Sequence, residues 1–202
     1  IIEGSPFFDD TVEPFNVDLD KARELMAEAG VTDGLDLTVD YIPGPAEQQR
    51  TVAEYLRSQL AEIGINVSVR AAPDFPTWAG RVGGHDFELS MDNVFNWGDP
   101  VIGVHRTYLT DNIRQGVIWS NTQSYSNARV DEILAAAAIE LDEAKRKELY
   151  NEFQQIVVGE VPIYFINAPP YHTAYNSRMV NPPLGIWGPM HPMDMIEMPQ
   201  GD

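Results

Sequence analysis

Three short stretches of the chain alternate between hydrophobic and polar residues, a pattern typical of β-strands that bury one face. The clearest is residues 35–41, in which leucine, valine and tyrosine residues occupy every second position. Residues 65–70 and 87–91 alternate in the same way. Each of the three stretches is therefore predicted to be a strand.

Hydrophobic residues at helical spacing separate these strands and recur after them. Asp18 or Asp20, and later Asp74, can accept hydrogen bonds from the free N–H groups of a first helical turn. Gly30 and Gly64 can end helices in the left-handed conformation. The predicted helices run over residues 20–29, 46–63 and 75–82, from about 128 onward, and from about 143 onward.

The segment from residue 35 to residue 70 is a strand–helix–strand unit, which predicts parallel strands joined by a right-handed crossover. We therefore expect an α/β fold with helices on the faces of an open sheet. Ligands of such sheets bind outside the carboxyl ends of the strands, where residues 93–127 are predicted to form a long loop. Two further strands are predicted at residues 163–167 and 172–175.

The composition narrows the possible partners of the chain. Its 202 residues suit one domain, and 13 basic against 31 acidic residues give a net charge of −18. This charge disfavours nucleic acid and anionic lipid as partners, while it either keeps the protein soluble or attracts cationic ligands. The absence of cysteine excludes disulfides and thiolate chemistry. No apolar stretch is long enough to span a membrane.

The sequence carries no recognisable catalytic, metal-binding or cofactor motif. The four histidines, His85, His105, His172 and His191, lack the spacing of helical zinc ligands. No nucleophile elbow and no phosphate-cradling glycine loop is present. We therefore predict a binding protein and not an enzyme, with no cofactor and no metal. His105 lies in the long loop, so a ligand contact is an alternative to a structural role.

The segment of residues 93–100 follows a predicted strand and combines an amide, an indole and a carboxylate. Asn96, Trp97 and Asp99 are therefore candidate ligand-binding residues, since Trp can wall an apolar pocket and Asp can pair with an ammonium group. The alternative is that Asp99 and Pro100 cap the helix that follows.

A second segment, residues 119–127, has the same polar and aromatic character. Trp119 and Asn121 are candidate ligand-binding residues there, because such sites hold their ligands through rings, amides and hydroxyls. The alternative is a polar surface loop that leads to a helix cap at Asn127.

Four motifs, in this order, resemble the C-terminal portion of the family 5 extracellular solute-binding proteins, the peptide, dipeptide and nickel receptors of bacterial ABC importers. They are DLDKARELMAEAG at 18–30, LAEIGINV at 60–67, YSN at 125–127 with VD at 130–131, and RKELY at 146–150 with Gln154 and EVP at 160–162.

The resemblance implies a lobe similar to type II periplasmic binding proteins, with a mixed, mostly parallel sheet and helices on both faces. Residues 1–170 would form the C-terminal lobe, and residues 171–202 a tail returning to an N-terminal lobe missing from this chain. The start at Ile1, without Met, suggests a cut inside a longer protein.

The family also implies a function and a location. The exported protein, periplasmic or extracellular, would capture a small solute between its lobes and deliver it to an ABC permease. An oligopeptide is the expected ligand, with an oligosaccharide, a metal chelate or a sensing role as alternatives. Peptide-binding members use the aspartate of a Trp-x-x-Asp element for the ligand's amino group. Asp99 matches either that aspartate or a later Asp-Pro of the same loop.

Overall fold

A computed structural model describes the chain except residues 14, 45–46, 96, 169–171, 186–190 and 200–202. Its sheet consists of β1 (Leu35–Tyr41), β2 (Ile65–Ala71) and β3 (Leu89–Ser90) in the order β2-β1-β3. Both pairings are parallel, and β1 pairs with β2 from Leu35 opposite Ile65 onward. The predicted strand–helix–strand unit is confirmed. The predicted α/β class is confirmed too, although every pairing in this described sheet is parallel rather than mixed.

Three helices accompany the sheet: α1 (Leu19–Glu28), α2 (Glu47–Ala61) and α3 (Phe75–Gly83). The predicted caps are confirmed, because Asp18 accepts the N–H of Lys21 at 2.9 Å and Asp74 accepts that of Thr77 at 2.8 Å. Both prevent orphan N–H groups in the first turn. The chain leaves α1 through Gly30, whose φ of 77° is left-handed and therefore strained for other residues.

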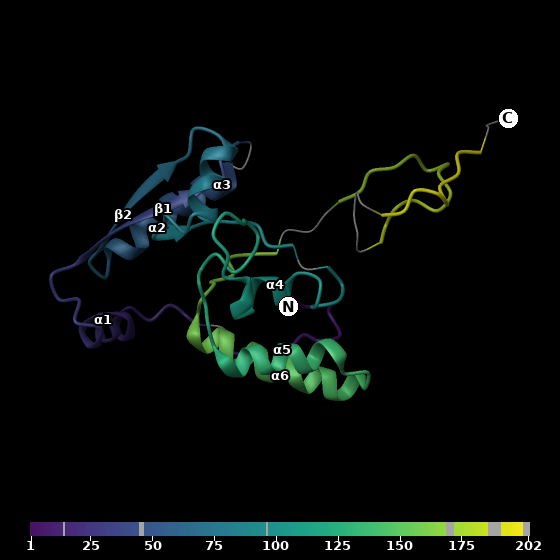
Figure 1. The fold of residues 1–202 in the computed structure, drawn as a ribbon. Helices are drawn as coiled ribbons and strands as arrows, with labels where there is room; N and C mark the ends of the chain where they lie inside the picture. The colour runs from purple at the N-terminus through teal and green to yellow at the C-terminus, as the bar shows by residue number, and fades with distance from the viewer. Residues whose placement is uncertain (14, 45–46, 96, 169–171, 186–190, 200–202) are drawn as a thin grey trace.

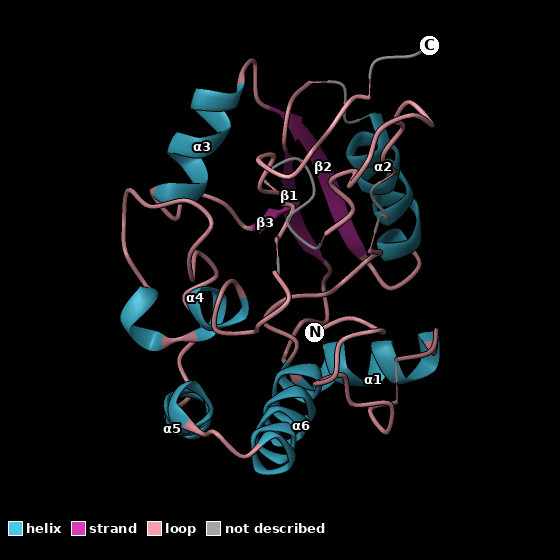
Figure 2. Cartoon of the chain, turned by 90° about the vertical axis from the view of Figure 1, so that its right-hand side faces the viewer, coloured by secondary structure: helices cyan, strands magenta, loops and turns pink. Residues whose placement is uncertain are grey.

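The first core lies between the sheet and α2, with Val39, Val67, Ala53 and Met91 buried in it. Figure 2 shows α3 on the opposite side of the sheet from α2. There the guanidinium of Arg81 bonds the buried carboxylate of Asp40 at 3.0 Å. Helices thus flank the sheet on both sides, as predicted. Besides this ion pair, α3 has a small apolar cluster of its own, in which Trp78 and Val82 are buried with Ala72, the residue after β2.

The second core is helical and lies beside α4 (Val104–Tyr108), α5 (Ala128–Ile139) and α6 (Glu143–Glu160), which appear together in Figure 1. The N-terminal segment joins it, because Phe7 is buried and its carbonyl accepts the side-chain N–H of Gln154. The helices from about residue 128 and about residue 143 were predicted, and Asn127 and Asp142 cap them. The loop predicted at 93–127 was partly wrong, since it contains α4 and the 3₁₀ turn η1 (Thr110–Asn112).

The predicted strands at residues 163–167 and 172–175 are wrong, because both segments are irregular in the structure. A segment forms a strand only where a neighbouring strand supplies hydrogen bonds. β3 is also shorter than predicted. The carboxylate of Glu88, rather than a backbone carbonyl, accepts the N–H of Thr38 at 2.6 Å there. In the C-terminal tail, Val180 and Glu197 form an isolated antiparallel bridge, and Figure 1 shows the tail extending away from the sheet and from helices α4, α5 and α6.

Candidate ligand-binding site

The carboxyl ends of β1, β2 and β3 meet at one edge of the sheet, because all three strands run in parallel. Asp92 lies two residues after the end of β3, and its carboxylate accepts the N–H of Asn93 at 2.6 Å. From α2, Gln49 accepts the N–H of Ile42, which follows β1, at 2.9 Å. This edge therefore brings polar side chains from separate parts of the chain together.

Asp92 has an unusual environment for an acidic residue. Burial raises the pKa of its carboxyl to about 6, although the N–H of Asn93, the indole of Trp119 and the charge of Arg106 oppose this rise. A carboxylate that is partly desolvated in this way has a strong tendency to gain a proton or a cationic partner. Asp92 was not among the residues predicted from the sequence, although its position directly after the alternating residues 87–91 was a signal for it.

The indole of Trp119 bonds to Asp92, and the ring of Trp119 lies near a second exposed ring, Phe75. Phe75 and Trp119 are 40% and 43% exposed, and their ring centroids lie 6.1 Å apart. Trp78 is fully buried beneath them, 5.5 Å from the Phe75 centroid. The backbone of Trp119 has a φ of 54°, which is rare for a bulky residue and costs conformational energy. The fold thus holds a large aromatic ring in an exposed position despite the strain.

Trp97 lies five residues after Asp92 in the chain. Its ring stacks on that of Phe95, with a centroid separation of 6.0 Å and an interplanar angle of 17°. The backbone N–H of Trp97 donates to the carbonyl of Ile102 at 3.2 Å, and this bond closes a turn. Asn96, the third member of this predicted group, lies outside the described residues.

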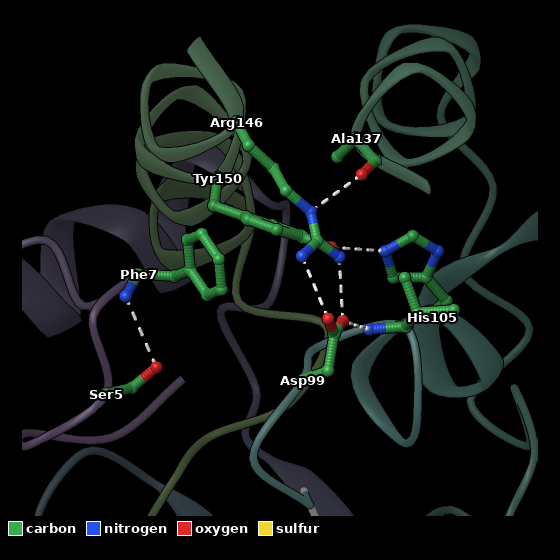
Figure 3. A network of polar contacts seen from close by, with 8 residues as sticks. Ser5, Phe7, Asp99, His105, Ala137, Arg146 and Tyr150 are labelled. Carbon is green, nitrogen blue, oxygen red and sulfur yellow. Dashed lines mark hydrogen bonds and ion pairs between the residues drawn. The ribbon is translucent and has the colours of Figure 1, made fainter. Parts of the chain in front are cut away.

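Asp99 is paired with Arg146 of α6, 47 residues later in the chain (Figure 3). Two guanidinium N–H groups donate to its two carboxylate oxygens at 2.7 and 2.8 Å, and the N–H of Val101 donates to it at 2.9 Å. The Arg146 bonds hold the pKa of the Asp99 carboxyl below its usual value. The alternative that Asp99 caps the next helix is wrong, because Gly103 is the N-cap of α4 and Asp99 closes the turn before it.

His105 belongs to the same network. Its Nε2 lies 2.9 Å from the hydroxyl of Tyr150, and burial together with the positive charge of Arg146 lowers the pKa of its imidazole to about 4. His105 is therefore neutral at pH 7 and bonded inside the second core, which is the structural alternative considered for it.

Asn121 is fully buried, and its side-chain amide organises the surrounding backbone. Its nitrogen donates to the carbonyls of Tyr108, Leu109 and Tyr125, and its oxygen accepts the N–H of Tyr125 at 2.9 Å. Both the nitrogen and the oxygen of the side-chain amide are therefore bonded to backbone groups of the chain itself.

The aromatic residues at the strand ends form an open surface. One cavity of about 420 Å³ is lined by residues that include Thr38, Arg70 and Glu88, and another of about 360 Å³ lies between α4 and α5. Neither cavity is lined by Phe75 or Trp119.

Within the part of the chain that the structure describes, no cluster of three or more His, Cys, Asp or Glu could hold a metal ion. No described helix is long and apolar enough to cross a membrane.

Comparison with known proteins identifies the family. Residues 1–115 match the model of the middle region of the bacterial extracellular solute-binding proteins, family 5. The chain belongs to this family. The resemblance seen in the four sequence motifs is thereby confirmed.

The two relatives described next are much longer than the chain. The dipeptide-binding protein of Pseudomonas aeruginosa strain PAO1 is 30% identical over 165 residues, which are 77% of this chain but 29% of that protein. The periplasmic binding protein DppA of Helicobacter pylori, solved with the peptide STSA, has a TM-score of 0.65 at 23% identity over 77% of this chain and 30% of its own. The chain thus spans less than a third of the length of either.

A third comparison is with an oligopeptide-binding protein of Thermotoga maritima solved with mannohexaose. It has a TM-score of 0.64 and 22% identity, covering 73% of this chain and 30% of its own. These structures share the fold with the present solute-binding protein, which confirms the predicted type of lobe.

Proposed function

We propose that this chain is one lobe of the substrate-binding component of an ABC importer, and that it captures a small peptide without any chemical step. Residues 1–170 would form the C-terminal lobe, with another lobe covering the open aromatic surface. The exported protein, in the periplasm or outside the cell, would then present its ligand to a membrane permease. Membership of the family and the names of the relatives support this proposal.

The tail is proposed to return to the other lobe. Met193, Met195 and Leu184 are between 51% and 66% exposed, although such side chains are usually buried in a complete domain. A first lobe that packs on residues 171–202 would remove this apolar surface from water.

The observation that carries the proposal is the group formed by Asp92, Phe75 and Trp119 at the carboxyl edge of the sheet. A peptide ammonium placed there would give the partly desolvated carboxylate its counter-charge and lie next to aromatic rings. We therefore assign the amino-group contact to Asp92 rather than Asp99, whose oxygens are already paired with Arg146. Trp97, Trp119 and Asn96 remain proposed ligand contacts, and Asn121 is proposed to support the loop.

An oligosaccharide is the second candidate ligand. Exposed rings such as Phe75 and Trp119 can stack on the apolar faces of sugars, and one structural neighbour was solved with mannohexaose. This ligand would not need an ionised carboxylate.

A thermal-shift experiment on the full-length protein distinguishes the two ligands. We expect trialanine to raise the melting temperature by mass action, and N-acetylated trialanine to have little effect because it lacks the ammonium group. Asp92→Asn should abolish the trialanine shift, whereas Asp33→Asn, a control at an exposed position, should keep it. A shift with mannohexaose alone would favour the oligosaccharide, and no shift with either would contradict the receptor function.

A further inference from the structure

Arg146 is held from several sides before its contact with Asp99 is considered (Figure 3). Its Nε donates to the carbonyl of Ala137 at the end of α5, at 2.8 Å. The guanidinium carbon lies 5.0 Å from the ring centroid of Phe7 and 5.5 Å from that of Tyr150. Its side chain is only 16% exposed, against 42% for Asp99. The orientation of the guanidinium is therefore determined by the second core.

Asp99, in contrast, belongs to a small turn that closes on itself. Its carbonyl accepts the N–H of Ile102 at 2.9 Å, and the carbonyl of Ile102 accepts the N–H of Trp97 at 3.2 Å. The carboxylate of Asp99 also accepts the N–H of Val101. Trp97 and Asp99 are thus linked by short backbone bonds, so a displacement of one changes the position of the other.

We infer that Arg146 is a positioning residue for the ligand site: it acts through Asp99 to determine where the ring of Trp97 stands. The role of Trp97 in binding rests on the proposed function, whereas the coupling between Arg146 and Trp97 does not. The planar fork of arginine matches both carboxylate oxygens of Asp99 and fixes a direction as well as a distance. Replacement of Arg146 by glutamine would remove both the positive charge and the two parallel N–H donors.

The structure supplies a matched control in Arg129 of α5. Its guanidinium makes the same two-pronged contact, at 2.7 and 2.8 Å, with Glu152 of α6. This pair is exposed and joins the same two helices, but it has no bond to the turn of residues 97–102. Arg129→Gln therefore removes a comparable two-pronged ion pair, together with an exposed contact to Glu132 at 3.1 Å, without touching the proposed coupling.

Fluorine NMR tests the coupling without any ligand. The protein is labelled with 5-fluorotryptophan, and the resonances of Trp78, Trp97 and Trp119 are assigned by single Trp→Phe substitutions. We expect Arg146→Gln and Asp99→Asn to shift or broaden the Trp97 resonance and to leave Trp78 in place, while Arg129→Gln changes none. Asp99→Asn leaves the packed guanidinium of Arg146 in place. This variant therefore tests the coupling even if Arg146→Gln does not fold. An unchanged Trp97 resonance, or equal changes at all three, would overturn the inference.

A binding experiment on the full-length protein then follows the coupling to the site, with trialanine as the probe. Arg146→Gln should weaken binding at least fivefold when Trp97 is present and less than twofold in the Trp97→Ala background, because coupled residues are not additive. Equal losses in both backgrounds would show that Arg146 does not act through Trp97. Absence of trialanine binding in the unmodified protein would count against the peptide ligand, and the fluorine spectra would still decide the role of Arg146.

Discussion

Asp40 and Arg70, direct neighbours across β1 and β2, form a two-pronged ion pair with distances of 2.8 and 2.6 Å. Arg81 of α3 adds a third bond to the same carboxylate at 3.0 Å. Asp40 is completely buried, while the side chains of Arg70 and Arg81 are 41% and 26% exposed. A buried carboxylate is tolerated only when it is paired, so this group ties α3 to the sheet.

Asp40→Ala should lower the free energy of unfolding by about 3–5 kcal/mol, because it leaves two arginines without their shared partner. Urea denaturation measures the change. The control Asp36→Ala removes an exposed carboxylate of the same strand, bonded to Asn66, and should cost less than about 1 kcal/mol. Similar losses in both variants would refute a special role for the buried carboxylate.

Asp92 and Asp99 should make opposite contributions to the pH dependence of stability. Burial raises the pKa of Asp92 from 3.8 to about 6 in the folded state. Its contribution is therefore fully present below pH 3.8 and is lost as the pH rises through about 6. Asp92→Asn should raise the melting temperature at pH 7.5 by about 2–4 °C, and the difference should vanish near pH 4. A lower melting temperature at pH 7.5 would contradict the desolvation of Asp92.

The pKa of Asp99 is lowered, chiefly by its hydrogen bonds with Arg146. Its stabilisation is present above the ordinary value of 3.8 and is lost as the pH falls further. Asp99→Asn should therefore lower the melting temperature at pH 7.5, and by less as the pH approaches 3. A calorimetric pH series on both variants tests the two signs together. A difference for Asp99→Asn that stays constant down to pH 3 would contradict this account.

Asn121→Ala should lower the free energy of unfolding by about 3 kcal/mol, because it leaves the carbonyls of Tyr108 and Tyr125 and the N–H of Tyr125 without the bonds that Asn121 supplies. Gln123→Ala is the control, since Gln123 makes a single bond to the carbonyl of Thr107. Chemical denaturation of both variants provides the comparison. If Asn121→Ala had normal stability but bound peptide more weakly, Asn121 would instead be a ligand-binding residue.

Salt should stabilise the protein, because a net charge of −18 makes the folded state repel itself. Raising sodium chloride from ~0.05 to ~0.5 M shortens the screening length to a few ångströms and should raise the melting temperature at pH 7.5 by several degrees. The same titration near pH 4, where many carboxylates are protonated, is the control and should give a smaller rise. A fall in melting temperature with salt at pH 7.5 would show that attractive ion pairs outweigh the repulsion.

The sequence alone determined the features that depend on neighbouring residues. The alternation at residues 35–41 predicted β1 with its exact bounds, and Asp18, Asp74 and Asn127 were recognisable as helix caps. Side-chain direction along a strand and hydrogen bonds in a first helical turn are set within a few residues, so a local pattern suffices. The order of these elements and four short motifs also led to the family.

The tertiary structure alone decided which distant groups meet. Residues 163–167 were predicted to be a strand but have no strand beside them, and Asp99 follows a strand but meets Arg146, 47 residues away. Asp92 gained its raised pKa from burial next to Trp119, which no local pattern reveals. Strand pairing, ion pairing and desolvation are properties of the surroundings of a residue, and those surroundings exist only once the chain is folded.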